Sequence, residues 1–309
     1  MTYVYGPVPS RRLGRSIGVD PLPPKTCNYQ CIYCQLGITT HFTNKRANFY
    51  PLEDIITDMQ TTTNNNRNKF DYVTFVGSGE PTLYKDIGIL IQNARELTDK
   101  RICVITNGSL LNNKEVSNDL MNSDVVMPSL DAGNEEDFIK INRPHPQIKY
   151  QSMVQGLIDF NKKYNGYFWL EVMLMKDIND SREKLLEIKQ KINLIQPDRV
   201  DINVPIRPPT EDWVEIPNDI VYERIREIFE DYSNINFPEK GSFEHSHGDF
   251  ERELLRIITR HPMREKQIIK TFSNLNLDKK TILEKLTILE SENVILKKIY
   301  NKQIFWRKK

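Results

Sequence analysis

The feature that most constrains the fold is a repeated alternation of short apolar segments and helical segments across residues 16–232. Strand-like segments are expected at 16–20, 72–76, 102–106, 124–130, 168–175 and 199–206, and helices at 52–59, 87–97, 148–164, 181–194 and 218–232. Such alternation is typical of right-handed βαβ units and a parallel sheet. Six units are too few for a closed eight-stranded barrel. The sequence therefore predicts an α/β fold, a partial (β/α)6 TIM-like barrel.

Two segments of this region are expected to lack regular structure. Residues 6–15 are rich in Gly, Pro and Arg, which favours a turn before the first parallel strand. Residues 61–66 read Thr-Thr-Thr-Asn-Asn-Asn, which favours a polar surface loop after the first helix.

Polar or glycine-rich clusters follow the strands, where barrel enzymes place their active sites. The clusters lie at 77–82, 106–109, 129–131, 176–180 and 207–209, and the first strand leads into a cysteine-rich segment. Because the carboxyl ends of parallel strands meet at one edge, the sequence predicts a single site there.

The cysteine-rich segment holds Cys27, Cys31 and Cys34, spaced C-x3-C-x2-C, in a chain with 4 Cys. Thiolates are the ligands that iron–sulfur clusters and zinc prefer. A structural zinc site needs four protein ligands, but the fourth cysteine, Cys103, lies in an apolar segment and is expected to be a buried core thiol. A 4Fe–4S cluster held by three thiolates would leave one iron open to a small ligand.

The composition is that of a soluble globular protein, with 39% hydrophobic and 28% charged residues. The sequence contains no apolar run of membrane-spanning length, and residues 1–7 do not resemble a signal peptide. A cytoplasmic location is therefore expected, in agreement with thiols that stay reduced. The net charge of +1 hides an asymmetry, because residues 250–309 carry 15 Lys and Arg against 7 Asp and Glu.

The predicted domains are a barrel at 1–235, a turn-rich linker at 236–248 and a small domain at 249–309. The small domain is expected to contain helices at 249–261, 264–272 and 278–292, then a hairpin that turns at Asn301-Lys302. This pattern resembles a winged helix. Its basic surplus fits nucleic acid such as RNA or DNA, while a protein partner and a merely solvated surface stay open.

Taken together, the motifs resemble those of the radical S-adenosylmethionine (SAM) superfamily. The cysteine loop with Tyr33, the Gly77–Pro81 segment (GSGEP), and Ser129 with Asp131 occur in the order that this family shows. The resemblance implies that Cys27, Cys31 and Cys34 bind a 4Fe–4S cluster. It also implies the SAM-binding residues Tyr33, Gly77, Gly79, Glu80, Asn107, Ser129 and Asp131. The plainer alternatives are a βα turn for Gly77–Pro81 and a helix cap or polar strand end for Ser129 and Asp131.

The resemblance also implies the reaction. An electron from flavodoxin or ferredoxin would cleave SAM to methionine and a 5′-deoxyadenosyl radical, which abstracts hydrogen from a substrate. Within the superfamily the chain is similar to uncharacterised Fe–S oxidoreductases, and distantly to wybutosine-synthesis enzymes that modify tRNA. Those tRNA enzymes carry extra cysteines for a second cluster, whereas this chain has only Cys103 to spare. A second cluster held mainly by cysteines is therefore excluded.

Candidate substrate contacts are less specific. They are Arg11, Arg12, Arg15, Glu171, Lys176, Asn203 and Arg207. Strand alternation is expected to turn Glu171, Met173 and Met175, with Asp201, Asn203 and Pro205, toward the barrel interior.

The alternative function is an iron–sulfur or zinc winged-helix regulator that senses redox state without catalysis. Such a regulator does not need the motifs at the strand ends, so the sequence favours an enzyme.

Overall fold

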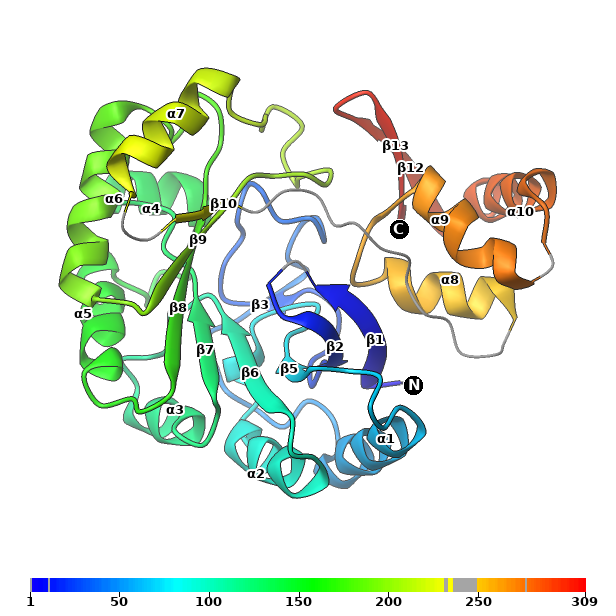
Figure 1. Cartoon of the computed structure of the whole chain (residues 1–309), viewed down its shortest axis with the longest axis horizontal. Coiled ribbons are helices and arrows are strands. Elements are labelled where there is room, and N and C mark those ends of the chain that lie inside the picture. Colours follow the sequence, from blue (N-terminus) through cyan, green and yellow to red (C-terminus); the bar gives the residue numbers. More distant parts are fainter. Residues whose placement is uncertain (1, 11, 231–232, 236–248, 276) are drawn as a thin grey trace.

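The computed structural model describes residues 2–10, 12–230, 233–235, 249–275 and 277–309 (Figure 1). A curved sheet with helices along its outer side forms the larger part. Its strands, in spatial order, are β1 (Val4–Ser10), β2 (Gly14–Val19), β5 (Tyr72–Phe75), β6 (Arg101–Thr106), β7 (Val125–Pro128), β8 (Tyr167–Met173), β9 (Arg199–Asn203) and β10 (Ser233–Ile235). From β2 to β10 neighbouring strands are parallel, and β1 pairs antiparallel with β2. The α/β prediction and all six predicted parallel strands are confirmed.

Helices of this part connect the parallel strands. They are α1 (Leu52–Asn65), α2 (Ile87–Leu97), α3 (Lys114–Leu120), α4 (Glu135–Asn142), α5 (Tyr150–Asn161), α6 (Arg182–Ile195) and α7 (Asp219–Ile228). Shorter elements lie in the loops at the carboxyl ends of the strands: β3 (Thr26–Cys27), β4 (His41–Phe42) and the 3₁₀ helix η1 (Pro81–Leu83). No described helix is long and apolar enough to cross a bilayer.

The expectations of irregular structure were wrong in part: the predicted turn is present at Arg12 and Leu13, but the residues before it and the polar run are regular. Residues 6–10 lie in β1, because an edge strand tolerates proline and this one is irregular between Tyr5 and Val8. Helix α1 continues through the polar run to Asn65, because Thr63 is buried and the Asn66 side chain donates to the carbonyl of Thr62 at the helix end. The pattern also missed α3, α4 and the short β10.

The outer face of the sheet packs against the helices in the main hydrophobic core. Leu170, Val172 and Leu174 are fully buried there, and Glu171 lies on the opposite face, as the alternation predicts. Met175, which was expected to face the interior, follows the end of β8 and is fully buried in the main core. Cys103 is also fully buried, in a small apolar cluster with Leu13 inside the sheet.

The C-terminal elements form a smaller module beside β1 (Figure 1). They are α8 (Phe250–Ile258), β11 (Met263–Arg264), α9 (Glu265–Phe272), η2 (Ser273–Leu275), α10 (Lys279–Ser291), β12 (Ile295–Tyr300) and β13 (Gln303–Lys308). The three strands form an antiparallel sheet ordered β11-β13-β12. Asn301 and Lys302 turn the hairpin with φ of 47° and 59°, as a two-residue turn requires. The winged-helix assignment and the domain boundaries stay predictions, and the linker at 236–248 lies outside the described residues.

The two parts share a hydrophobic core. Tyr5 and Val8 of β1 are buried in the cluster that contains Leu254, Phe272 and Trp306 of the C-terminal module. Strand β1 therefore belongs to the barrel sheet through its backbone and to the C-terminal core through its side chains.

We expect Leu170→Ala to lower the free energy of unfolding by about 2–5 kcal/mol, because it leaves a cavity under the helices. The matched control is Leu186→Ala on α6, where the side chain is 43% exposed and the change should stay within about 0.5 kcal/mol. Urea unfolding followed by circular dichroism measures both. Equal losses in the two variants would contradict the assignment of the buried face.

Candidate functional site

Two loops at the carboxyl ends of the strands pair with each other and form the centre of the site. The amide of Lys25 donates to the carbonyl of Ser78 at 2.6 Å, and the amide of Glu80 donates to the carbonyl of Thr26 at 3.1 Å. The segment with Cys27 thus runs beside the Gly77–Pro81 segment. The two motifs are 50 residues apart in sequence and adjacent in space.

The glycines of the second motif make this pairing possible. A Cβ on Gly79 would lie 1.8 Å from the carbonyl oxygen of Thr26, and a Cβ on Gly77 would lie 1.9 Å from Oδ1 of Asp20. The groups that approach these two glycines belong to the chain itself. The predicted contacts of Gly77 and Gly79 with SAM stay a prediction.

Glu80 is a buried carboxylate that holds loops of the site together, with 2% of its surface exposed. Its Oε1 accepts from the amide and hydroxyl of Thr82 and from the hydroxyl of Thr106, and its Oε2 accepts from the amide of Asn107. Burial raises the pKa of Glu80, and these donors lower it in part. The bonds from Thr106 and Asn107 tie the loop of Glu80 to the end of β6.

Helix α4 supports the other side of the cysteine loop. The amide of Ile32 donates to the carbonyl of Ile141, and the amide of Gln30 donates to the carbonyl of Asn142. Nδ2 of Asn142 lies 3.5 Å from Sγ of Cys31 and 2.8 Å from Oδ2 of Asp131. The sequence reasoning missed Asn142, because the end of a helix remote in sequence carries no motif signal.

Asp131 lies at the centre of a hydrogen-bond network below this loop and is 3% exposed. It accepts from the hydroxyl of Tyr33 at 2.6 Å, from Asn142, and from the amide of Met173 at 2.9 Å. Tyr33 and Asp131, predicted as separate cofactor contacts, are therefore bonded to each other. Ser129 is half-buried, and its backbone forms an isolated parallel β-bridge with Glu171 on β8. Ribose binding by Ser129 and Asp131 stays a prediction.

Asn107 lies beside the first cysteine, and its predicted contact with SAM stays a prediction. Its Nδ2 lies 2.7 Å from Oδ1 of Asn28 and 3.9 Å from Sγ of Cys27. The amide of Tyr29 also approaches Sγ of Cys27, at 3.4 Å. The sulfur of Cys27 therefore has two N–H donors close to it, from Tyr29 and Asn107.

The three cysteines are half-buried and electrostatically coupled to one another. Burial raises the pKa of Cys27 to about 12, with Glu80 adding to the effect. Burial also raises the pKa of Cys31 well above its usual range, followed by the charge of Asp131. Three adjacent thiols with raised pKa values become thiolates only beside a compensating positive charge, which a metal centre provides.

The predicted substrate residues fall into separate places. Arg12 enters the sheet interior and pairs with Glu171, which also accepts from Asn203 at 2.8 Å. Arg207 donates to Gln35 of the cysteine loop at 2.9 Å. These four residues face the site from the interior or from the loop.

The remaining predicted contacts are not brought there. Lys176 pairs with Glu215 on the surface at 2.7 Å. Arg15 lies at the amino end of β2, and its amide donates to Asp71, so it is at the opposite edge of the sheet from the cysteines. Sequence proximity to the cysteines did not bring Arg15 to the site, because it follows the reversal between β1 and β2, whereas Arg12 reaches the sheet interior. Arg11 lies outside the described residues.

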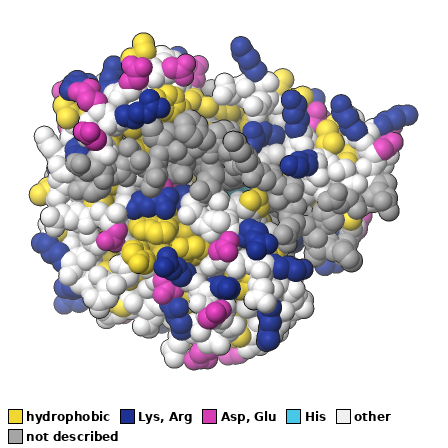
Figure 2. Space-filling model, viewed as in Figure 1, with side chains coloured by type: hydrophobic (Ala, Val, Ile, Leu, Met, Phe, Trp, Pro, Cys, Tyr) yellow, Lys and Arg dark blue, Asp and Glu magenta, His cyan; other side chains and the backbone are white. Residues whose placement is uncertain are grey.

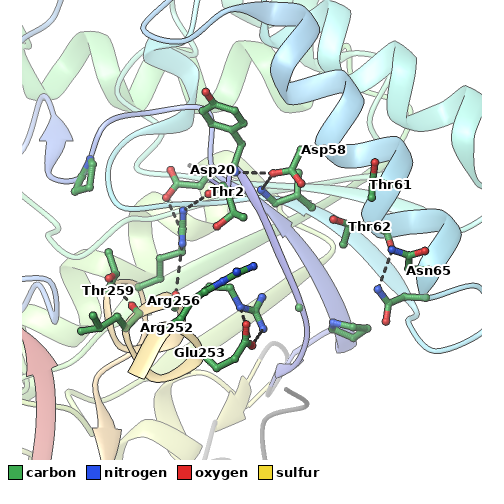
Figure 3. Close-up of a pocket in the computed structure, with 18 of the residues that line it drawn as sticks. Thr2, Asp20, Asp58, Thr61, Thr62, Asn65, Arg252, Glu253, Arg256 and Thr259 are labelled. Atoms are coloured by element: carbon green, nitrogen blue, oxygen red, sulfur yellow. Dashed lines mark hydrogen bonds and ion pairs between the residues drawn. The ribbon is translucent and has the colours of Figure 1, made fainter. Parts of the chain in front are cut away.

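Asp20, missed by the sequence reasoning, links the site to the C-terminal module. Its Oδ2 accepts from the hydroxyl of Ser78 at 2.7 Å and from Nε of Arg260 at 2.8 Å, and it is 1% exposed. Beside it is a cavity of about 1000 Å³ (Figure 3). Residues of α8, including Arg252 and Arg256, line one side of the cavity, and Thr61 and Thr62 of α1 line another. The cavity contains none of the three cysteines.

Fold and motifs define a class of protein. The model of the radical SAM superfamily matches residues 22–188, more than half of the chain. The chain belongs to the radical SAM superfamily.

Particular relatives extend this result. UPF0026 protein MJ1312 of Methanocaldococcus jannaschii is 35% identical over 317 residues, which cover 100% of this chain and 96% of that protein. A Brachyspira hyodysenteriae protein named GTPase Obg is 40% identical over 302 residues, covering 96% of this chain and 44% of that longer protein. This chain therefore matches less than half of the second relative.

Solved structures share the fold. Streptococcus suis SuiB bound to S-adenosylmethionine superposes with a TM-score of 0.52 at 19% identity, covering 71% of this chain and 49% of that chain. TYW1 with a lysine-pyruvate adduct superposes with a TM-score of 0.51 at 18% identity, covering 74% of this chain and 78% of that chain. At these identities the likeness shows the partial barrel fold alone.

Family membership gives the cofactors as one 4Fe–4S cluster and SAM. The donor set fits the cluster: three coupled, half-buried thiols lie in one loop. No group of three His, Cys, Asp or Glu residues within the described ranges converges closely enough to hold a single ion. A cube of four irons binds each thiolate through a different iron, so its ligands stand further apart than those of one zinc.

We expect Thr106→Val to destabilise the apoprotein by about 1.5–3 kcal/mol, because it removes a donor to the buried carboxylate of Glu80. The control is Thr61→Val on the exposed face of α1, which keeps the shape change and should shift stability by no more than about 0.5 kcal/mol. Thermal unfolding of both variants makes the comparison. A wild-type melting curve for Thr106→Val would show that Glu80 is not held as described.

Proposed function

We propose that this protein is a radical SAM enzyme that holds a 4Fe–4S cluster on Cys27, Cys31 and Cys34 and abstracts hydrogen from an RNA substrate. The observation that carries the enzyme assignment is the pairing of the cysteine loop with the Gly77–Pro81 segment at the strand ends. When bound, the cluster and SAM supply one-electron cleavage of the sulfonium, and the resulting 5′-deoxyadenosyl radical removes the hydrogen.

The residues of the chain bind, orient and shield. Asn107, Asn142 and the amide of Tyr29 direct donors at the cysteine sulfurs, and hydrogen bonds to the sulfurs tune a cluster. The backbone groups of Gly77 and Gly79 and the polar side chain of Ser129 are our candidates for the contacts with SAM. Tyr33 and Asp131 would act together, since their hydrogen bond fixes the ring beside the cluster loop.

Arg12, Glu171 and Asn203 are the proposed substrate contacts in the interior. Their network is polar and nearly buried, with Glu171 8% and Asn203 4% exposed. A polar substrate group that reaches this network would exchange hydrogen bonds with it, whereas an apolar group would leave buried charges without partners. This supports a polar substrate such as a nucleobase.

The C-terminal module supports RNA as the carrier of that group. Lys279, Lys280, Lys297, Lys302 and Lys309 are exposed there. Figure 2 shows Lys and Arg side chains spread over the face of this module. Lys298 does not share this surface, because it pairs with Asp212 of the barrel part at 2.5 Å. Exposed lysines of one sign attract the phosphate backbone.

The regulator alternative has less support. A sensor needs the cysteines, but it does not need Glu80 and Asp131 to be built into strand ends, and the chain belongs to a superfamily of enzymes. Reduced flavodoxin or ferredoxin is the proposed electron donor, and the proposed location is cytoplasmic.

Anaerobically reconstituted protein given dithionite and SAM should form 5′-deoxyadenosine, measured by liquid chromatography. Cys31→Ala should abolish the product, because it removes one cluster ligand. Cys103→Ala is the matched control and should retain the cluster spectrum and product, since this thiol is buried in an apolar cluster. A wild-type protein with a full cluster and no product would refute the enzyme assignment.

RNA affinity should fall steeply as salt rises, because binding would release counterions from the phosphates. Replacing Lys279 and Lys280 together by Gln should weaken binding of a tRNA pool and flatten the salt slope. The control pair is Lys189 and Lys191 on α6, remote in sequence from the module. Fluorescence anisotropy measures all three proteins. A salt-independent affinity, or equal losses in both pairs, would contradict the RNA proposal.

A further inference from the structure

The third cysteine lies in a turn that the C-terminal module approaches. The amide of Gly37 donates to the carbonyl of Cys34 at 3.2 Å, and Gly37 has a φ of +86°. A Cβ placed on Gly37 would lie 3.3 Å from Nη1 of Arg307 and 3.7 Å from Nζ of Lys25. Two cations thus flank the turn, and Arg307 comes from β13, about 270 residues further along the chain.

Arg307 has an unsatisfied group at this place. Its Nη1 is buried and has no hydrogen-bond acceptor among the described residues. Asp212 and Arg307 attract each other electrostatically, but Asp212 already pairs with Lys298 at 2.5 Å. A buried guanidinium N–H without an acceptor is costly, so the geometry indicates an anionic partner at the cysteine turn.

A 4Fe–4S cluster on Cys34 has the required charge. Three thiolates give the oxidised cluster a net negative charge, and reduction adds one electron. Favourable interactions with Arg307 therefore grow on reduction, because the Coulomb energy scales with the charge.

The surroundings of the three cysteines differ in sign. Glu80 accepts from the amide of Asn107, whose side chain lies beside Cys27, and Asp131 accepts from Asn142, which also approaches Cys31. Near Cys34 the charged neighbours are Lys25 and Arg307, which flank Gly37 of the same turn. The cationic side of the site is thus the Cys34 side, to which the barrel contributes Lys25 and the C-terminal module contributes Arg307.

The module is held firmly enough to place this charge. Arg260 donates to Asp20, and the side chain of Gln35 in the cysteine loop donates to the carbonyl of Arg260 at 3.3 Å. Lys298 on β12 pairs with Asp212, and β12 pairs with β13 at Leu296 and Arg307. These contacts hold the β12–β13 hairpin, which carries Arg307, in place beside the cysteine turn.

We propose that Arg307 is a positioning residue of the C-terminal module that stabilises the reduced cluster and so raises its reduction potential. The module then belongs to the electron-accepting site as well as to any surface that binds substrate. The step concerned is the uptake of one electron from a reduced flavodoxin or ferredoxin, with no atom transferred. The inference rests on cluster binding by Cys27, Cys31 and Cys34, and it does not depend on the identity of the substrate.

The test is an anaerobic redox titration of the full reconstituted chain, with the reduced cluster followed by electron paramagnetic resonance (EPR). Arg307→Gln should shift the midpoint potential to a more negative value, and Arg307→Lys should retain most of the wild-type potential. Lys308→Gln is the matched control, since it removes the same charge from the adjacent exposed residue, and its shift should be clearly smaller. Equal shifts for Arg307→Gln and Lys308→Gln, or no shift, would overturn the proposal.

Iron and sulfide content separates this result from a failure of the proposed function. A wild-type protein without a cluster would refute the cluster assignment itself. If Arg307→Gln loses its cluster, Lys25→Gln provides the second measurement at the same turn. A more negative potential in Lys25→Gln than in Lys308→Gln would support the claim that cations near Cys34 stabilise the reduced cluster. An unchanged potential in Lys25→Gln would overturn that claim.

Discussion

The site depends on one contact, the backbone pairing between the cysteine loop and the Gly77–Pro81 loop. Two hydrogen bonds join the loops, and both glycines are needed because any Cβ there would collide with Thr26 or Asp20. Glu80 then fixes the second loop to the end of β6 by accepting from the hydroxyl of Thr106 and the amide of Asn107, and it accepts two more hydrogen bonds from Thr82 within its own loop. Cys27 is placed by this contact, while Cys31 is placed from the other side by the end of α4.

The C-terminal module extends the same construction. Strand β1 pairs with the barrel sheet and packs its side chains into the C-terminal core. Arg260 reaches Asp20, which holds Ser78 of the glycine loop. A movement of the module would therefore be transmitted to both cofactor loops. This arrangement makes the module a component of the site rather than an appendage on a linker.

Much of this architecture could be predicted from the sequence, because strand–helix alternation and the clusters after each strand are local patterns. The same reasoning placed Glu171 and Asn203 on the interior face, since strand alternation is strict. It failed for β1, where proline suggested a turn, and for Arg15, where sequence proximity to the cysteines did not mean spatial proximity. Asn142, Asp20 and Arg307 could not be found, because their roles come from contacts between segments far apart in the chain.

The central claim is that the cluster has three cysteine ligands and that SAM binds the fourth iron, which no cysteine occupies. The most direct measurement is electron–nuclear double resonance on the reduced, reconstituted protein with SAM carrying ¹⁵N in its amino group. The account predicts that SAM changes the EPR spectrum and that ¹⁵N shows a hyperfine coupling to the cluster. An unchanged spectrum without ¹⁵N coupling, in a protein whose cluster is fully assembled, would contradict it.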